Sequence, residues 1–131
     1  MSTQTPTIPT LRAYQADCLT ACQSAEARGL RRALVVMPTG SGKTCVAGEW
    51  LASRREHGPS LFLVHLDALF AQAYRTLQTR FPHLTIGTMR GRRTHLHADI
   101  VIASVQTLSR PARLAQLSTM AQPFGTIVVD E

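Results

Sequence analysis

The feature that most constrains the fold of this chain is a short glycine-rich segment between an apolar run and a helical pattern. Residues 37–44 are MPTGSGKT. The apolar run 33–37 fits a strand that is covered on both faces. A helix is expected from Lys43 toward His57. A strand that enters a helix through glycines is the context that a phosphate-binding loop requires. The sequence therefore predicts an α/β fold with this loop at a strand-to-helix turn.

The residues of this loop have the chemistry that phosphate binding needs. Its two glycines allow backbone N–H groups to turn inward, and the positive end of the following helix favours an anion. Lys43 would reach the β- and γ-phosphates, and the Thr44 hydroxyl would bind Mg²⁺. Met37 stands where the strict pattern has its first glycine. The predicted phosphate-binding residues are Pro38, Thr39, Gly40, Ser41, Gly42, Lys43 and Thr44.

Strands and helices alternate along the rest of the chain. Apolar runs predict strands at 61–64, 84–88, 99–103 and 126–129. Helical spacing predicts helices over 11–29, 66–77 and 112–120. This order is typical of a parallel sheet with helices on both faces, wound with right-handed crossovers. We expect residues 1–10 to be a polar lead and 11–131 to form one domain that is incomplete at its C-terminus.

Composition narrows the class of protein without deciding its function. The formal net charge is +6 and Lys43 is the only lysine, so the positive charge is almost all arginine. Codon bias and a phosphate-binding surface explain that equally well. The three cysteines have no paired spacing, which argues against a disulfide and against a zinc site. The chain shows neither a signal peptide nor a bilayer-spanning apolar run, so we expect a cytoplasmic protein without a membrane partner.

Two carboxylates stand at the far end of the sequence. The apolar run 127–129 leads directly into Asp130 and Glu131. Ligands of parallel sheets bind at the edge where buried strands end. An aspartate there can hold Mg²⁺, and a neighbouring glutamate can orient and deprotonate an attacking water. Together with the loop around Lys43, this pair predicts a site for phosphoryl transfer to water.

These features resemble the first RecA-like domain of superfamily 2 helicases of the DEAD/DEAH-box-like group, over nearly the whole chain. In that family the first loop position is not always glycine. The resemblance implies that Mg²⁺ and ATP bind between the loop and the terminal acids, with Lys43, Asp130 and Glu131 as catalytic residues. Residues 11–15 are similar to the family's glutamine motif, so Gln15 would recognise adenine. An exposed helix glutamine is the alternative for Gln15.

Two further stretches resemble the nucleic-acid motifs of the same family. Residues 63–72 are similar to the motif after the second strand, where His65 is the candidate contact. Leu66 stands where the family often has arginine. Residues 103–108 are similar to a later motif, in which Ser104, Gln106 and Thr107 would bind phosphates. A plain strand-to-helix turn is the alternative explanation for this second stretch.

The forms of these motifs are closest to the branch that contains type I and type III restriction-enzyme motor subunits. That resemblance implies duplex DNA as the partner and an ATP-dependent DNA helicase or translocase as the full-length protein. A second RecA-like domain is expected in a longer chain, and this part alone is not expected to turn over ATP. The alternatives are a truncated, inactive nucleotide- or nucleic-acid-binding fragment and a P-loop NTPase outside the helicases.

One basic segment is left without an assigned role. Arg90, Arg92 and Arg93 surround Gly91 in a predicted loop. Such a patch could contact phosphate. A solvated surface loop explains the same residues equally well.

Overall fold

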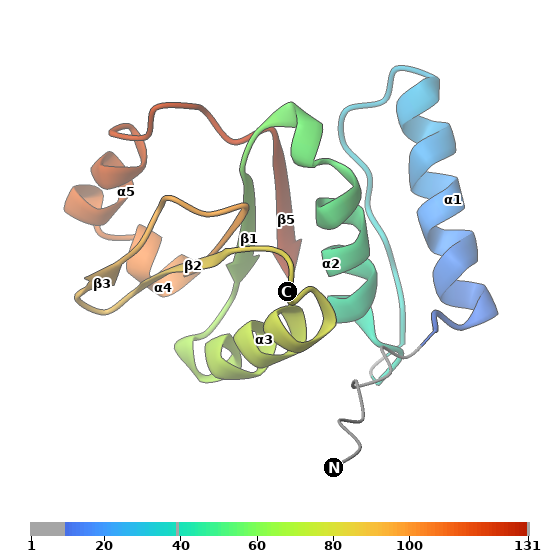
Figure 1. Cartoon of the computed structure of the whole chain (residues 1–131), viewed down its shortest axis with the longest axis horizontal. Coiled ribbons are helices and arrows are strands. Elements are labelled where there is room, and N and C mark those ends of the chain that lie inside the picture. The colour runs from blue at the N-terminus through green and yellow to red at the C-terminus, as the bar shows by residue number, and fades with distance from the viewer. Residues whose placement is uncertain (1–9, 39, 131) are drawn as a thin grey trace, which may run out of the picture.

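The computed structural model describes residues 10–38 and 40–130. Five strands form one sheet in the order β3-β2-β4-β1-β5 (Figure 1). Four of them are mutually parallel, and the short β3 pairs antiparallel with β2. The strands are β1 (Ser60–Val64), β2 (Ile86–Arg90), β3 (Arg93–Thr94), β4 (Ile100–Ser104) and β5 (Thr126–Asp130). The predicted α/β fold with a mostly parallel sheet is confirmed.

The helices follow the predicted order with small changes at their ends. The helix after the glycine loop ends at Ser53 and is followed by a 3₁₀ turn, Arg55–His57, where one helix to His57 was predicted. The last helix covers Pro111–Leu117 where 112–120 was predicted, and a short helix that was not predicted, Val105–Leu108, precedes it. The helices are α1 (Ala13–Ala27), α2 (Lys43–Ser53), α3 (Asp67–Arg80), α4 (Val105–Leu108) and α5 (Pro111–Leu117). None of the helices in the described part is long and apolar enough to cross a bilayer.

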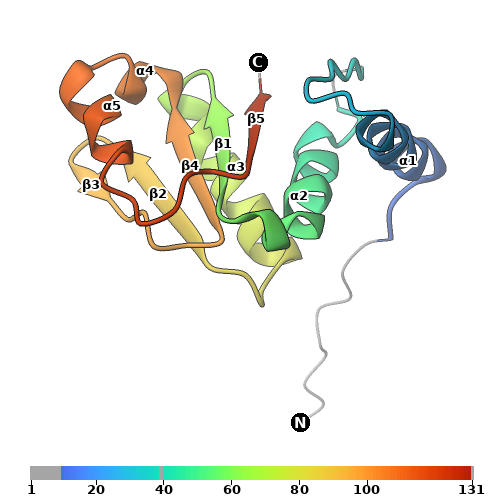
Figure 2. The same cartoon turned by 90° about the horizontal axis from the view of Figure 1, so that it is seen from above.

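The sheet has a buried cluster on each face, because successive side chains of a strand point to opposite sides. Phe62 and Ile102 belong to the cluster that contains Leu77 of α3. Leu61 and Val101 belong to the other cluster, against which Leu108, Leu117 and Phe124 pack. Helices α2 and α3 therefore cover one face, while α4 and α5 cover the other (Figure 2). This is the predicted arrangement with helices on both faces.

The strand predicted at residues 33–37 does not form. This segment carries no ladder hydrogen bonds, and Leu34 and Val36 remain 90% and 85% exposed. It lines a cavity together with β5, so space separates it from the nearest sheet edge. An apolar run shows that a segment gains from burial, but a strand also needs a neighbouring edge for its backbone groups. Among the described residues that neighbour is missing.

The parallel ladder brings the carboxyl ends of four strands to one edge of the sheet. Val64, the last residue of β1, is in register with Ser104 of β4 and with Asp130 of β5. On the next strand β2 ends at Arg90, one residue after Met89 pairs with Ala103. Residues that are up to 66 positions apart, Val64 and Asp130, are thus neighbours in space. This edge is where a ligand of a parallel sheet is expected.

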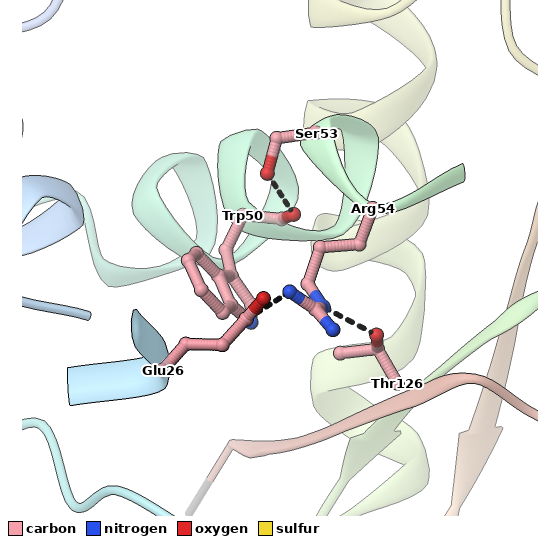
Figure 3. A network of polar contacts seen from close by, with 5 residues as sticks. All are labelled: Glu26, Trp50, Ser53, Arg54 and Thr126. Carbon is pink, nitrogen blue, oxygen red and sulfur yellow. Dashed lines mark hydrogen bonds and ion pairs between the residues drawn. The ribbon is translucent and has the colours of Figure 1, made fainter. Parts of the chain in front are cut away.

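Arg54 connects α1, α2 and β5 at the opposite side of the molecule (Figure 3). Its guanidinium forms an ion pair with Glu26 of α1, and its Nε donates to Thr126 Oγ1 at 2.8 Å. The same group lies 5.0 Å from the ring centre of Trp50. The Arg54 hydrogen bond, with its charge, lowers the pKa of Glu26 below the ordinary value of 4.5. Arg54 therefore holds α1, the outermost helix in Figure 1, to the rest of the domain.

We expect the Glu26 to Arg54 ion pair to make stability depend on pH in the acid range. Because the folded-state pKa of Glu26 is lowered, its contribution is present above 4.5 and is lost as pH falls through the folded pKa. Glu26→Gln should lower the Tm at neutral pH, and the difference from wild type should close as pH falls below 4.5. Thermal melts across this range measure it. Glu56→Gln, at an exposed glutamate, is the control and should show no comparable effect.

Candidate nucleotide-binding site

The glycine loop has the backbone conformation that the sequence predicted. Gly40 and Gly42 have φ angles of 78° and 81°, a region that residues with a Cβ rarely adopt. Ser41 N donates to Pro38 O at 3.2 Å, which closes a turn. Gly42 precedes the first residue of α2, and no described side chain caps that helix end. The first N–H groups of α2 are therefore available to an anion.

Helix α1 holds this loop through two side chains that meet at one carbonyl. Tyr14 Oη and Gln15 Nε2 both donate to Ser41 O at 2.8 Å. Gln15 Oε1 accepts from Arg12 N at 2.9 Å, which fixes the amide orientation. Gln15 is buried, so the exposed-glutamine alternative is wrong. Tyr14 was not predicted as a loop contact. Its position beside Gln15 in the glutamine motif was the one available signal.

A cavity of about 1040 Å³ runs along the whole of β5, between that strand and the segment before the phosphate loop. Lys43 from the start of α2 and Asp130 from the end of β5 both line it. The start of α2 and the end of β5 lie at the same side of the molecule in Figures 1 and 2. Cys22 of α1 also lines the cavity, and burial, with a contribution from Cys18, raises the pKa of its thiol. Two predicted catalytic residues, Lys43 and Asp130, thus border the same cavity.

Of the remaining predicted residues of this site, some are described by the structure and two are not. Thr44 lies half-buried in the first turn of α2, next to Lys43. Ser41 Oγ is buried and has no hydrogen-bond partner among the described residues. A buried hydroxyl without a partner is rare in folded proteins and fits a ligand oxygen as its missing partner. Thr39 and Glu131 lie outside the described residues. The donors that are described fit a polyphosphate.

The two predicted nucleic-acid stretches are adjacent at the same edge. His65 follows β1 and is exposed. Ser104 ends the neighbouring β4 and is fully buried. Its Oγ accepts from Thr107 N at 3.1 Å and lies 2.9 Å from Thr107 Oγ1. Gln106 is exposed, and its Oε1 accepts from Asp67 N at 3.2 Å. Ser104 and Thr107 thus shape the turn internally, whereas His65 and Gln106 reach the surface.

The sheet, the glycine loop at the start of α2 and the acid at the end of β5 together define a RecA-like domain of the P-loop class. The family described as "Type III restriction enzyme, res subunit" matches residues 8–131. The chain therefore belongs to this family.

Curated relatives and a solved structure agree with this placement. The chain is 34% identical over 133 residues to "Putative ATP-dependent helicase IRC3" of Saccharomyces cerevisiae, covering 94% of this chain and 19% of that protein. It is 35% identical over 126 residues to "Putative mitochondrial ATP-dependent helicase irc3" of Schizosaccharomyces pombe, covering 92% and 20%. The Sulfolobus solfataricus SWI2/SNF2 ATPase core in complex with dsDNA matches with a TM-score of 0.78 at 22% identity, covering 95% of this chain and 26% of that one. The chain spans about a fifth of the length of the curated relatives.

Gly42 is expected to tolerate a side chain less well than Gly40. A Cβ at Gly42 would lie 2.4 Å from Gln15 Nε2, whereas a Cβ at Gly40 would meet nothing within 4 Å. Both alanine variants bear the cost of a left-handed residue, about 1–2 kcal/mol, but only Gly42→Ala also displaces the Gln15 amide. Denaturant midpoints should fall in the order wild type, Gly40→Ala, Gly42→Ala.

Adding Gln15→Ala separates the two causes. Gln15→Ala should lower the denaturant midpoint less in the Gly42→Ala background than in wild type. In that background the loss of the Gln15 amide also removes the clash with the new Cβ. Equal effects in both backgrounds would show that Gln15 does not restrict Gly42.

Proposed function

We propose that residues 11–131 form the first RecA-like domain of an ATP-dependent DNA helicase or translocase, after a lead of residues 1–10. The observation that carries the proposal is that Lys43, at the start of α2, and Asp130, at the carboxyl end of β5, line the same cavity. Membership in the restriction-subunit family supports it. So do two relatives named as ATP-dependent helicases and a fold neighbour solved with double-stranded DNA.

In this proposal the loop binds the phosphates of ATP. Lys43 contacts the β- and γ-phosphates, the N–H groups at the start of α2 surround them, and Ser41 Oγ gains the partner it lacks. The strand end at Asp130 and the Thr44 hydroxyl would hold Mg²⁺, which neutralises phosphate charge when bound. Pro38 and Thr39 complete the loop. Glu131 orients and deprotonates the attacking water.

Gln15 has two tasks in the proposal. Its amide already holds the loop through the Ser41 carbonyl and closes on Arg12 N. A primary amide has two N–H donors and an oxygen with two lone pairs, so one of each stays available for an adenine edge. The same amide would therefore contact both adenine and the phosphate loop, so that adenine binding and the loop conformation are linked.

Nucleic acid would lie along the same edge of the sheet. His65 and Gln106 are the exposed contacts, while Ser104 and Thr107 position Gln106 through their shared hydrogen bonds. Duplex DNA is the partner we favour. A second RecA-like domain would complete the catalytic cleft by supplying positive charge to the transferring phosphoryl group. The cytoplasmic location expected from the sequence stays a prediction, and one relative is named as mitochondrial.

Lys43→Ala should weaken ATP binding. A hydrogen bond to a charged group contributes about 1.5–3 kcal/mol, so the Kd for ATP with Mg²⁺ should rise roughly 10- to 150-fold. Isothermal titration of the chain with ATP measures this. Arg75→Ala removes one positive charge from the exposed side of α3 and should leave the Kd unchanged. If Lys43→Ala binds ATP as wild type does, the proposed phosphate site is wrong.

The motor function itself is tested by hydrolysis. In the protein at its natural length, ATPase activity should rise when duplex DNA is added, because closure of the nucleotide cleft depends on bound nucleic acid. ATPase that no DNA or RNA stimulates would instead indicate a P-loop NTPase of another kind. An absence of both hydrolysis and ATP binding would indicate an inactive fragment.

A further inference from the structure

The distribution of charge along the chain is strongly one-sided. Between Ala68 and Val129 the only acidic residue is Asp99. The same stretch contains the arginines Arg75, Arg80, Arg90, Arg92, Arg93, Arg110 and Arg113. Asp99 is already engaged, since it accepts from Thr85 N and Oγ1 and forms an ion pair with Arg55 at 3.5 Å. The part of the domain built from β2, β3, β4, α4 and α5 is therefore left with uncompensated positive charge.

Three of these arginines are concentrated on the hairpin that joins β2 and β3. Gly91 has a φ of 56°, the positive value that a tight hairpin turn needs at its first central residue. Arg90 and Arg93 are directly paired across the two strands. Paired residues of an antiparallel ladder have their Cβ atoms about 4.5–5.5 Å apart on one face, and like charges there are destabilising. The fold thus places two arginines side by side at the end of the hairpin.

Within residues 10–38 and 40–130, no acidic side chain pairs with the arginines of this hairpin. Arg90, Arg92 and Arg93 are all exposed, and none of the three ion pairs among the described residues includes them. The guanidinium of Arg90 lies 5.2 Å from the ring centre of Phe70, which fixes its position without neutralising it. An anion bound from outside the chain would neutralise the charge of the neighbouring arginines and so stabilise the hairpin.

Helix α5 keeps the hairpin in place. The Arg113 guanidinium donates from Nη2 to Arg93 O at 2.9 Å and from Nη1 to Thr94 Oγ1 at 2.6 Å. Gln116 Oε1 accepts from the same Nη1 at 2.7 Å. Arg113 is thus a positioning residue for β3. Arg110 is exposed one helical turn before it, so it adds charge to the same side of α5.

The position of the hairpin relative to the site decides what this surface can bind. Arg90 ends a strand that is parallel to β4, β1 and β5, so the hairpin lies at the same edge as Gln106, His65 and Asp130. Three strand intervals of about 4.8 Å separate β2 from β5, so the hairpin lies roughly 14 Å from the end of β5, and the phosphate loop lies beyond that strand. That distance is too far for the phosphates of the same nucleotide. It is well within one turn of a duplex that runs along the edge.

We propose that Arg92 and Arg93, supported by Arg90 and positioned by Arg113, bind the phosphate backbone of duplex DNA at the β2–β3 hairpin. This surface extends the nucleic-acid contacts of His65 and Gln106 by one strand on the side away from ATP. The inference rests on the proposed function, because it takes the same DNA as its partner. It concerns backbone charge alone and adds no sequence specificity.

The salt dependence of DNA binding tests this proposal. Each phosphate contact contributes about 0.9 to the slope of log K against log salt concentration. The chain is titrated into a short fluorescent DNA duplex of mixed sequence at several NaCl concentrations. Arg92→Ala/Arg93→Ala should reduce the slope by about two and weaken binding most at low salt. Arg92→Lys/Arg93→Lys should keep most of the slope, since the charges remain.

A matched control removes the same charge elsewhere. Arg28→Ala/Arg75→Ala changes two exposed arginines on α1 and α3 and should leave the slope within experimental error of wild type. Thermal melts of every variant establish that the fold is intact. If the hairpin double variant keeps the wild-type slope, or if the control loses as much, the hairpin is not a phosphate contact. If the wild-type chain binds no DNA, the nucleic-acid part of the proposed function fails together with the hairpin.

Discussion

The parallel ladder through β2, β4, β1 and β5 is the constraint on which the rest of this structure depends. Its register places Arg90, Ser104, Val64 and Asp130 at one edge, although long stretches of chain separate them. Each strand is too short to be stable alone, and the two buried clusters that cover the sheet supply the favourable free energy. The arrangement of this edge is therefore a consequence of burial elsewhere, and the candidate site residues stand where the buried strands end.

Most of the fold could be predicted from local patterns. Apolar runs located β1, β2, β4 and β5 to within two residues, and the signal is plainest for β1 and β4, which are buried on both faces and therefore apolar almost throughout. The segment 33–37 has the same pattern and forms no strand, since strand formation also depends on a partner edge that composition does not report. The short β3 was treated as a basic loop. Its formation depends on Gly91 and on Arg113, which is 20 residues from the carbonyl that it contacts.

The sequence predicted which residues belong to the candidate site better than it predicted what each residue does there. Lys43 and Asp130 were expected to meet, and they line one cavity. Gln15 was expected to face a base, yet its amide is also bonded to the loop, a contact across 26 positions that no local spacing reveals. Ser104 resembles a phosphate-binding residue, but its burial and its bond to Thr107 give it a structural task. A motif match indicates which residue occupies a position. The hydrogen bonds of that residue in the structure decide what it does there.

The missing ladder at residues 33–37 also affects how motion is distributed in the domain. All five residues of the central strand β4 are buried, so its amides should exchange with solvent only through the rarest openings. On the other side of the site, the chain enters the phosphate loop through an exposed segment without sheet hydrogen bonds. The loop is thus attached to a compliant segment at one end and to helix α2 at the other. The segment before the loop can therefore shift when a ligand binds, while α2 and the hydrogen bonds from Tyr14 and Gln15 to Ser41 O hold the loop itself.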